Sequence, residues 1–455
     1  MKKIFITVND GSIARNILRS FVLEKIIQHS DVHVGLVTHA DKEEFYRTEF
    51  GSDRISVFGI LGRPLSFFER VLSYCIRNGL WTETILMDQR THMEGRYVAF
   101  AAKRTFIYLF GKSKWFHAFV RRLFLLRAPS RAMEELFSRE KPDLLFSTDV
   151  QIELDFDATI AAHKNNVPVV GMVRSWDNPT SRGGLVPYIH VVLLVWSPYI
   201  AEKMEYVQQY PRERIRLVGI PHFDWYVKDI IVPREEFFRK LGIDPKKKMI
   251  LFAGIGDFHA PHEIEVLEII ARKLREGMIE DAKEVVLVFR PHPAFRFDEN
   301  SVKRLGNVVF DSGISSYSGK DRSSWEMEQE QVVHLANSLA HCDVLVTTAS
   351  TMTVDAAAFD KPIVCVAFDG KSQEPHWRSV KRYYHDYSHY IALSRTKGFA
   401  IAYTRESLIT YINNYLDNPN LDAEGRERIR QEFIWKLDGH SADRVAHAAL
   451  MFSRN

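Results

Sequence analysis

The chain has 455 residues, too long for one ordinary hydrophobic core, which predicts two domains of roughly 200 residues each. Hydrophobic residues make up 46% of it and charged residues 26%, a composition that excludes a disordered or fibrous protein. The formal net charge of +3 is close to neutral, so no overall field marks a nucleic-acid-binding protein.

The first 220 residues alternate between short apolar strands and helices. A strand at residues 3–8 leads through Asn9-Asp10-Gly11-Ser12 into a helix with Ile13, Ile17, Leu18 and Phe21 on one face. Further apolar strands are predicted at residues 32–37, 143–147, 167–173 and 191–196. This alternation predicts a parallel sheet covered by helices on both faces.

A second α/β series follows a strand end and turn at residues 219–224. Strands are predicted at residues 249–252, 285–289, 308–310, 344–347 and 363–368, with helices at 262–276, 329–340 and directly after Ser350. The tail contains a helix at 423–437, a break at Gly439, and a helix at 442–452 that we expect Ser441 to cap. The predicted class is therefore α/β, with two Rossmann-like parallel-sheet domains at residues 1–222 and 223–438, facing a central cleft where ligands bind at the carboxyl ends of the strands.

The strand at residues 285–289 runs directly into Arg290-Pro291-His292-Pro293. It delivers an arginine and a histidine to its carboxyl end, and the two prolines stiffen the loop. Such donors suit a phosphate or a carboxylate. The alternative is a proline-stiffened turn with an exposed histidine.

The strand at residues 344–347 ends in a run of hydroxyl residues. Five of the seven residues from 347 to 353 carry hydroxyls, among them Ser350, Thr351 and Thr353, and a helix follows at once. The free N–H groups of that helix and these hydroxyls predict a diphosphate cradle, with Arg290 and His292 neutralising the leaving nucleotide. The alternative is a Ser/Thr helix cap with Asp355 as the acid of the first turn.

Two weaker signals belong to the same predicted donor site. Glu326 could accept hydrogen bonds from ribose hydroxyls, although an acid there also fits a solvated helix start. Gly254 and Gly256 follow the strand at 249–252 and allow a ligand to approach closely. A bare GxG lacks the third glycine of a dinucleotide fingerprint.

The predicted acceptor site lies in the first half of the chain. Its binding residues are Ser12 and Arg15 near the first strand, with Arg174, Trp176 and Asn178 in a polar loop at 174–184. A general base must be a carboxylate or a histidine. Asp177 is the first choice and Asp10 the second, with His190 and Asp149 as further candidates, and each also fits a structural role.

The segment from Arg96 to Arg131 carries nine Lys or Arg residues and nine aromatic residues, and no acid. Read as helices, it predicts an amphipathic surface able to lie on an anionic membrane. The equal alternative is a solvated helical face with its aromatic residues in the core. Aromatic–basic interleaving also suits single-stranded nucleic acid, but no other feature supports that partner.

Cys75, Cys342 and Cys365 are widely spaced and odd in number, which fits a reducing compartment without a disulfide framework or a zinc site. The N-terminus has only about five apolar residues in a row, too few for a signal peptide, and no stretch is long enough for a membrane span. We therefore expect a cytoplasmic protein, with a peripheral position on the inner face of the membrane as the further expectation. No metal or other cofactor is predicted, because Asp155-Phe156-Asp157 precedes a helical run instead of ending a strand.

These residues resemble GT-B-type glycosyltransferases and, more narrowly, the CDP-glycerol glycerophosphotransferase-like enzymes of surface-polymer synthesis. The resemblance covers both halves and rests on residues 219–224, 290–293, 343–355 and 359–363. It implies that the C-terminal domain binds the nucleotide donor through His292, Ser350 and Thr351, and the N-terminal domain binds the acceptor. It also implies that residues 439–455 form a helix that packs back on the N-terminal domain.

The chain departs from those glycerophosphotransferases in the segment that follows the predicted strand at residues 344–347. They usually carry Asp-Tyr-Ser-Ser where this chain has Thr348-Ala349-Ser350-Thr351-Met352. We therefore expect metal-independent transfer of a sugar from a nucleotide-diphosphate sugar or a CMP sugar to a glycan or lipid-linked acceptor in bacterial surface polysaccharide synthesis. Glycerophosphate transfer, a nucleotide-sugar 2-epimerase and a non-enzymatic membrane-peripheral binding protein are the alternatives.

Overall fold

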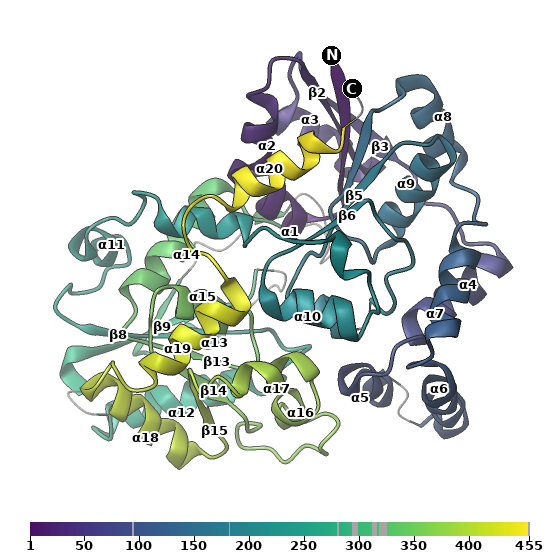
Figure 1. The fold of residues 1–455 in the computed structure, drawn as a ribbon. Helices are drawn as coiled ribbons and strands as arrows, with labels where there is room; N and C mark the ends of the chain where they lie inside the picture. The colour runs from purple at the N-terminus through teal and green to yellow at the C-terminus, as the bar shows by residue number, and fades with distance from the viewer. Residues whose placement is uncertain are drawn as a thin grey trace. The chain divides into compact units, whose positions relative to one another are not determined.

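The structure is a computed structural model that describes residues 1–92, 95–181, 183–279, 282–293, 299–311, 316–317 and 325–453. The chain forms two compact units (Figure 1). Unit 1 contains Met1–Asp224 and His440–Asn455, and unit 2 contains Trp225–Gly439. Each unit is built on its own parallel β-sheet, which confirms the predicted fold class of two parallel-sheet α/β domains.

Unit 1 contains a seven-stranded parallel sheet in the order β3-β2-β1-β4-β5-β6-β7. Its strands are β1 (Lys2–Val8), β2 (Val32–His39), β3 (Ile55–Ile60), β4 (Leu144–Ser147), β5 (Val169–Met172), β6 (Val192–Val195) and β7 (Ile215–Leu217). Strands β4, β5 and β6 are buried along their whole length, as expected of central strands covered on both faces. Helices α2 (Phe21–Ile27), α3 (Glu43–Phe50), α8 (Arg131–Glu140), α9 (Glu153–Lys164) and α10 (Pro198–Tyr206) complete the layers.

The helix predicted after β1 is divided into three pieces. Helix α1 (Gly11–Ile13) is followed by a π-helical turn at Ala14–Leu18, and α2 begins only after Ser20. Ser20 has an extended backbone, and its hydroxyl caps α2 by accepting the N–H of Val22. The single-helix prediction was wrong because Ser20 starts a new helix where the apolar periodicity alone continues.

Between β3 and β4 the chain forms a helical layer with a hydrophobic core of its own. Its helices are α4 (Phe67–Asn78), α5 (Glu83–His92), α6 (Tyr97–Phe110) and α7 (Lys114–Phe124). The core contains Leu72 and Ile76 of α4, Ile107 of α6, and Val120 and Phe124 of α7. None of the helices in the described part of the chain is both long and apolar enough to cross a membrane.

Unit 2 contains a six-stranded parallel sheet in the order β10-β9-β8-β13-β14-β15. These strands are β8 (Lys248–Ala253), β9 (Val285–Arg290), β10 (Val308–Phe310), β13 (Val344–Thr347), β14 (Ile363–Val366) and β15 (Ala400–Ala402), and a small antiparallel pair joins β11 (Ser316–Tyr317) to β12 (Trp325–Glu326). The helices are α11 (Arg234–Lys240), α12 (Glu263–Arg275), α13 (Glu299–Lys303), α14 (Gln329–His341), α15 (Met352–Ala358), α16 (Lys381–His385), α17 (Ser388–Ser394), α18 (Arg405–Asp417) and α19 (Ala423–Ile429).

The last helix, α20 (Ser441–Met451), belongs to unit 1, where it packs against α2. Ser441 was predicted to cap this helix, and that prediction was wrong. Ser441 is itself the first helical residue, and the side chain of His440 before it makes no cap hydrogen bond. The cap comes from far along the chain, because the Asp224 carboxylate accepts the N–H groups of Ser441 at 3.0 Å and Ala442 at 2.8 Å.

Candidate functional site

Three of the predicted donor loops meet at one edge of the unit 2 sheet. Strand β8 lies between β9 and β13, and the register pairs Ala253 with both Arg290 and Thr347. The strands are parallel, so the loops that follow them emerge side by side at their carboxyl ends. The structure thus brings together the Gly254–Gly256 loop, the Arg290–His292 loop and the Ser350–Thr353 segment.

Arg290 is held inside unit 2 by Asp311, which follows β10. Nη1 of Arg290 lies 2.9 Å from an oxygen of Asp311, and the two side chains are only 4% and 1% exposed. His334 of α14 contacts the other oxygen of Asp311 at 2.7 Å. Burial raises the pKa of Asp311, but Arg290 and His334 outweigh it and lower this pKa to about 2. The guanidinium therefore anchors the base of the Pro291–Pro293 loop through a charged pair.

Two further residues were predicted to bind the nucleotide donor: His292, which lies in this loop, and Glu326, which lies on a short strand. His292 is half-buried, two residues beyond the anchored arginine. Glu326 lies on β12 and is fully buried. The predicted roles of Arg290, His292 and Glu326 in donor binding stay predictions, and the buried position of Glu326 means that a ribose reaches it only after local movement.

Backbone N–H groups of the loop after β8 are bonded to a carboxyl side chain of the protein itself. The carboxylate of Glu263, the first residue of α12, accepts the N–H groups of Ile255 at 2.8 Å and Gly256 at 3.1 Å. Gly254 donates its N–H to the carbonyl of Arg290 at 2.9 Å. Burial raises the pKa of Glu263 to about 7, although the two backbone donors act in the opposite direction. The loop that the sequence predicted to let a ligand approach closely therefore has its Ile255 and Gly256 amides bonded to Glu263.

The hydroxyl run after β13 separates into an outer and an inner part. Thr351 is exposed and Ser350 is half-buried, with its hydroxyl accepting the N–H of Met352 at 3.2 Å. Thr353 is fully buried, and its hydroxyl lies 2.9 Å from that of Tyr390, which also donates to the carbonyl of Ser350 at 2.6 Å. Tyr390 therefore fixes the segment from within, and the hydroxyls of Ser350 and Thr351 remain on its outer side.

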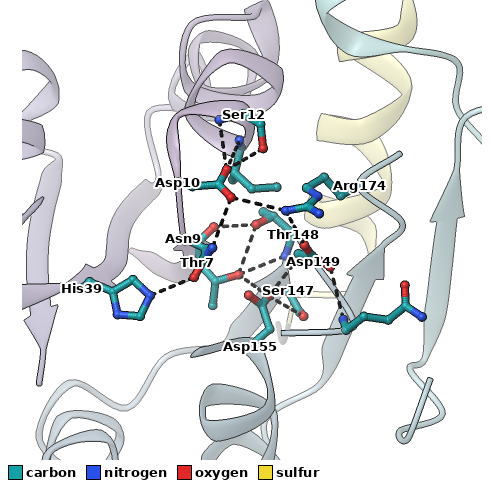
Figure 2. A network of polar contacts seen from close by, with 12 residues as sticks. Thr7, Asn9, Asp10, Ser12, His39, Ser147, Thr148, Asp149, Asp155 and Arg174 are labelled. Atoms are coloured by element: carbon teal, nitrogen blue, oxygen red, sulfur yellow. Dashed lines mark hydrogen bonds and ion pairs between the residues drawn. The ribbon is translucent and has the colours of Figure 1, made fainter. Parts of the chain in front are cut away.

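In unit 1, a polar network lies at the carboxyl ends of β1 and β4 (Figure 2). One oxygen of Asp155 accepts the hydroxyls of Thr7 at 2.6 Å and Ser147 at 2.7 Å, and the N–H of Asp149 at 3.2 Å. Burial raises the pKa of Asp155 to about 7, and the nearby charge of Asp149 adds to the rise. Asp155 therefore holds the ends of the two strands together and changes its charge near neutral pH.

Arg174 links this buried network to the surface. Its Nη1 lies 3.3 Å from an oxygen of Asp10 and 3.2 Å from an oxygen of Asp149 (Figure 2). Burial raises the pKa of Asp10, but Arg174 and hydrogen bonds from Ser12 and Ile13 outweigh it, so this pKa lies below its usual value. Burial raises the pKa of Asp149, and Arg174 offsets only part of that rise. Asp10 is the part-exposed, ionised member of this group, and Asp149 is its enclosed member.

The remaining predicted acceptor residues are spread around this group. Ser12 donates to Asp10 through its N–H and its hydroxyl, and Arg15 bonds to the neighbouring Asn16. Trp176 and Asn178 are buried, and the side-chain oxygen of Asn178 has no hydrogen-bond partner among the described residues. Arg182 of the same loop lies outside the described residues.

Two of the candidate bases differ sharply in their surroundings. Asp177 is half-buried, and its negative charge acts on Arg174 and Asp149. His190 is enclosed beside Tyr210, and burial lowers the pKa of its imidazole to about 3. A histidine that stays neutral and enclosed in this way fits a structural role, so Asp10 and Asp177 remain the predicted bases.

Sequence reasoning missed the buried partners that hold both groups in place. Asp155 was noticed for its spacing to Asp157, but on α9 these side chains bond to different partners, and Asp157 accepts the N–H and hydroxyl of Ser130. The contacts of Asp311 with Arg290 and His334 could not be predicted from the sequence, because Asp311 and His334 do not stand in a recognisable motif. Within the described part of the chain no group of three His, Cys, Asp or Glu side chains is placed to hold a metal ion.

Solved structures share this two-unit fold at low sequence identity. The UDP-GlcNAc 2-epimerase from Neisseria meningitidis bound to UDP-GlcNAc is 10% identical, with a TM-score of 0.58, over 99% of this chain and 100% of that one. A putative UDP-N-acetylglucosamine 2-epimerase from Listeria monocytogenes is 12% identical, with a TM-score of 0.55, over 98% and 95%. The wall teichoic acid polymerase TagF is 12% identical, with a TM-score of 0.52, over 98% and 88%.

At the level of sequence, a search of curated proteins finds no match for the chain. A family model does match. The model of CDP-glycerol:poly(glycerophosphate) glycerophosphotransferase covers residues 173–450, which is more than half of the chain and includes the Arg174 loop, all of unit 2 and most of α20. The chain therefore belongs to the CDP-glycerol:poly(glycerophosphate) glycerophosphotransferase family.

Proposed function

We propose that the protein transfers glycerol phosphate from CDP-glycerol to a hydroxyl group of a bacterial surface polymer or of its lipid-linked primer. The observation that carries this proposal is the single edge of the unit 2 sheet where the loops after β8, β9 and β13 emerge together, inside the region that the family model covers. Ligands of open parallel sheets bind at this edge. The three unpaired cysteines fit a reaction on the cytoplasmic side of the membrane.

In this proposal unit 2 binds the donor. The hydroxyls of Ser350 and Thr351 and the half-buried His292 contact the diphosphate, and Arg290 keeps the His292 loop in position through Asp311. Negative charge develops on the departing nucleotide, and His292 stabilises it by donating a hydrogen bond. Because Glu263 occupies the amides of Ile255 and Gly256, the donor binds beside this loop unless Glu263 moves.

Unit 1 binds the acceptor in this proposal, and Asp10 receives its proton. The acceptor oxygen forms a bond to the phosphorus that carries glycerol, the bond from that phosphorus to the bridging oxygen breaks, and CMP leaves. Asp10 is ionised and part-exposed beside Arg174, so it is ready to accept the hydroxyl proton. A phosphate of the polymer that pairs with Arg174 weakens the pull of Arg174 on Asp10 and makes Asp10 a stronger base.

Sugar transfer is the second candidate, and the hydroxyl run at residues 347–353 favours it. This run differs from the Asp-Tyr-Ser-Ser segment that the glycerophosphotransferases usually carry. In sugar transfer the acceptor oxygen bonds to the anomeric carbon, and the whole nucleoside diphosphate leaves. With a nucleotide-diphosphate sugar as donor, the leaving nucleotide therefore distinguishes the two reactions; a CMP sugar also releases CMP, so there the donor that is consumed distinguishes them.

The test incubates the purified protein with CDP-glycerol or a panel of nucleotide sugars, with and without a poly(glycerol phosphate) primer. We expect primer-dependent release of CMP from CDP-glycerol. Primer-dependent release of a nucleoside diphosphate from a sugar donor would establish the second candidate instead. Isomerised nucleotide sugar without an acceptor would identify an epimerase, and no turnover of any donor would contradict both transferase proposals.

A matched pair of histidine variants links this reaction to the proposed site. His292→Phe should lower the rate by about 100-fold or more, because phenylalanine cannot donate a hydrogen bond to the leaving group. His447→Phe, at an exposed position on α20, should leave the rate unchanged. Equal rates for both variants would remove His292 from the reaction.

A further inference from the structure

The loop between β8 and α12 presents two consecutive backbone N–H groups to a single oxygen atom. Oε2 of Glu263 accepts the N–H of Ile255 at 2.8 Å and that of Gly256 at 3.1 Å. Gly256 has a φ of 85°, in the left-handed region that favours glycine. Consecutive N–H groups that converge in a turn form an anion-binding nest. The loop therefore provides a place for one negatively charged oxygen, and we call the N–H groups of Ile255 and Gly256 the amide nest.

Gly254 leaves space beside that oxygen. A Cβ atom at position 254 would lie 3.1 Å from each carboxylate oxygen of Glu263, which is closer than most Cβ contacts in proteins. The N–H of Gly254 donates instead to the carbonyl of Arg290 at 2.9 Å. The amide nest thus borders the loop that carries His292, at the edge of the unit 2 sheet where the proposed function places the donor.

The loop is also held by bonds that do not involve the carboxylate of Glu263. The carbonyl of Gly256 accepts the N–H groups of His259 at 3.0 Å and Ala260 at 2.9 Å. Helix α12, which begins at Glu263, is fixed by the hydrophobic residues that it buries in the core of unit 2. A rotation of the Glu263 side chain is therefore enough to empty the amide nest, and such rotations are fast.

Two buried carboxylates of unit 2 differ in how their charge is compensated. Asp311 pairs with Arg290 and His334, which lower its pKa to about 2. Among the described residues, the groups that act on Glu263 are two neutral N–H donors and the negative charge of Asp257, so burial raises the pKa of Glu263 to about 7. A buried carboxylate that lacks a cationic partner gains little from staying enclosed. Glu263 is therefore displaceable in a way that Asp311 is not.

We propose that Glu263 is an internal competitor for the donor: its carboxylate occupies the amide nest while the donor is absent, and a phosphoryl oxygen of the nucleoside diphosphate takes the same two N–H groups when the donor binds. Donor binding includes the cost of moving Glu263, so the apparent affinity of the chain is lower than that of the open nest. The proposal rests on the proposed function only in placing a diphosphate at this sheet edge. It does not depend on which group is transferred.

The first test is calorimetric titration of the full chain with CDP, UDP and inorganic pyrophosphate, the last of which binds without a nucleobase. We expect Glu263→Ala to bind pyrophosphate about tenfold more tightly than the natural chain, as when a binding-competent state rises from about 10% to full population. Glu263→Gln keeps a carbonyl oxygen for the two N–H groups but loses the charge that strengthens these bonds, so its gain should be smaller, about threefold. Thermal unfolding of each variant checks that it is folded.

Asp257→Asn is the control that separates displacement from simple repulsion. Asp257 is exposed in the same loop, so its charge is screened, and the affinity should stay within about twofold of that of the natural chain. Equal tightening in Asp257→Asn and Glu263→Ala would mean that only repulsion is relieved, and the proposal would be wrong. If Glu263→Ala binds pyrophosphate no more tightly than the natural chain, Glu263 is a permanent brace of the loop, and the proposal falls while the donor site stands. No binding of any probe to any variant would overturn both.

The second test observes the amide nest in the natural chain. Ile255-Gly256 is the one Ile–Gly pair in the sequence. Labelling isoleucine with ¹³C at its carbonyl and glycine with ¹⁵N therefore gives a single carbonyl-correlated amide signal in NMR spectra, that of Gly256. We expect saturating pyrophosphate to shift this signal and to bring the natural chain and Glu263→Ala to the same final position. A signal that stays in place while calorimetry shows pyrophosphate bound would mean that Glu263 keeps the nest, and the proposal would be overturned.

Discussion

Arg290 and Asp311 form an ion pair inside unit 2, although 20 residues separate them in the chain and neither is more than 4% exposed. Removal of one charge leaves the other buried without its partner. We expect Asp311→Asn to lower the free energy of unfolding by about 3–5 kcal/mol in urea titrations. The exposed Asp417→Asn on α18 is the control and should be neutral. An equal, small effect of both variants would show that the pair contributes little.

The protonation of Asp155 predicts an unusual dependence of stability on pH. Its folded pKa of about 7 lies above the unfolded value near 3.8, so the folded state binds a proton more tightly. The contribution of Asp155 to stability is therefore complete below about pH 4 and declines as the pH rises toward 7. Asp155→Asn mimics the protonated form and should stabilise the protein at pH 8 by up to about 4 kcal/mol, with no gain at pH 4. Urea titrations at the two pH values check this, and an equal loss at both would contradict it.

Arg174 connects stability and activity in unit 1. In Arg174→Gln the carboxylates of Asp10 and Asp149 lose their shared cation, so we expect a loss of about 3–5 kcal/mol of stability. The pKa of Asp10 should rise, and an acid limb should appear in the pH profile of kcat/KM that the natural chain lacks above about pH 4. Arg216→Gln, at an exposed position on β7, is the control. An unchanged pH profile would argue against Asp10 as the base.

Replacement by valine should have different effects at Thr351 and at Thr353: the first should weaken binding of the donor, and the second should lower stability. Thr351→Val, at the exposed position, should weaken binding of the nucleotide donor about fivefold without changing stability. Thr353→Val should leave the Tyr390 hydroxyl with one partner fewer and cost about 1–3 kcal/mol of stability. Calorimetric binding and thermal unfolding measure the two effects. If Thr353→Val affected only binding, the inner and outer assignment would be wrong.

The predictable part of the fold follows from its apolar strands. Runs such as residues 344–347 and 192–195 are buried on both faces, so their sequences carry a clear signal. Strand β3 at Ile55–Ile60 was missed because Ser56 and Gly59 interrupt its apolar pattern. The start of a new helix after Ser20 was missed because the apolar periodicity continues through the position where the Ser20 side chain caps α2.

The candidate site could be located from sequence only as far as its loops. Strand ends identified the segments that meet at the sheet edge, but not which side chains in them face inward. Thr351 and Thr353 look equivalent in the sequence. In the structure they differ because the hydroxyl of Thr353 contacts that of the buried Tyr390, whereas Thr351 is exposed. Arg121 and Arg122 are neighbours, and only the first reaches the carbonyls of the core. Long-range contacts of this kind depend on the packed structure.

The cap that Asp224 places on α20 has a consequence for synthesis. Unit 2 is one continuous stretch and can fold once residue 439 has left the ribosome, whereas unit 1 waits for Ser441 and the helix it begins. At about 5–20 residues per second, the face of α2 that packs against α20 stays uncovered for roughly 10–45 s after Asp224 is made. During that interval the side of α2 that later contacts α20 is open to other partners, and the Asp224 carboxylate lacks the two N–H groups that it accepts in the folded chain.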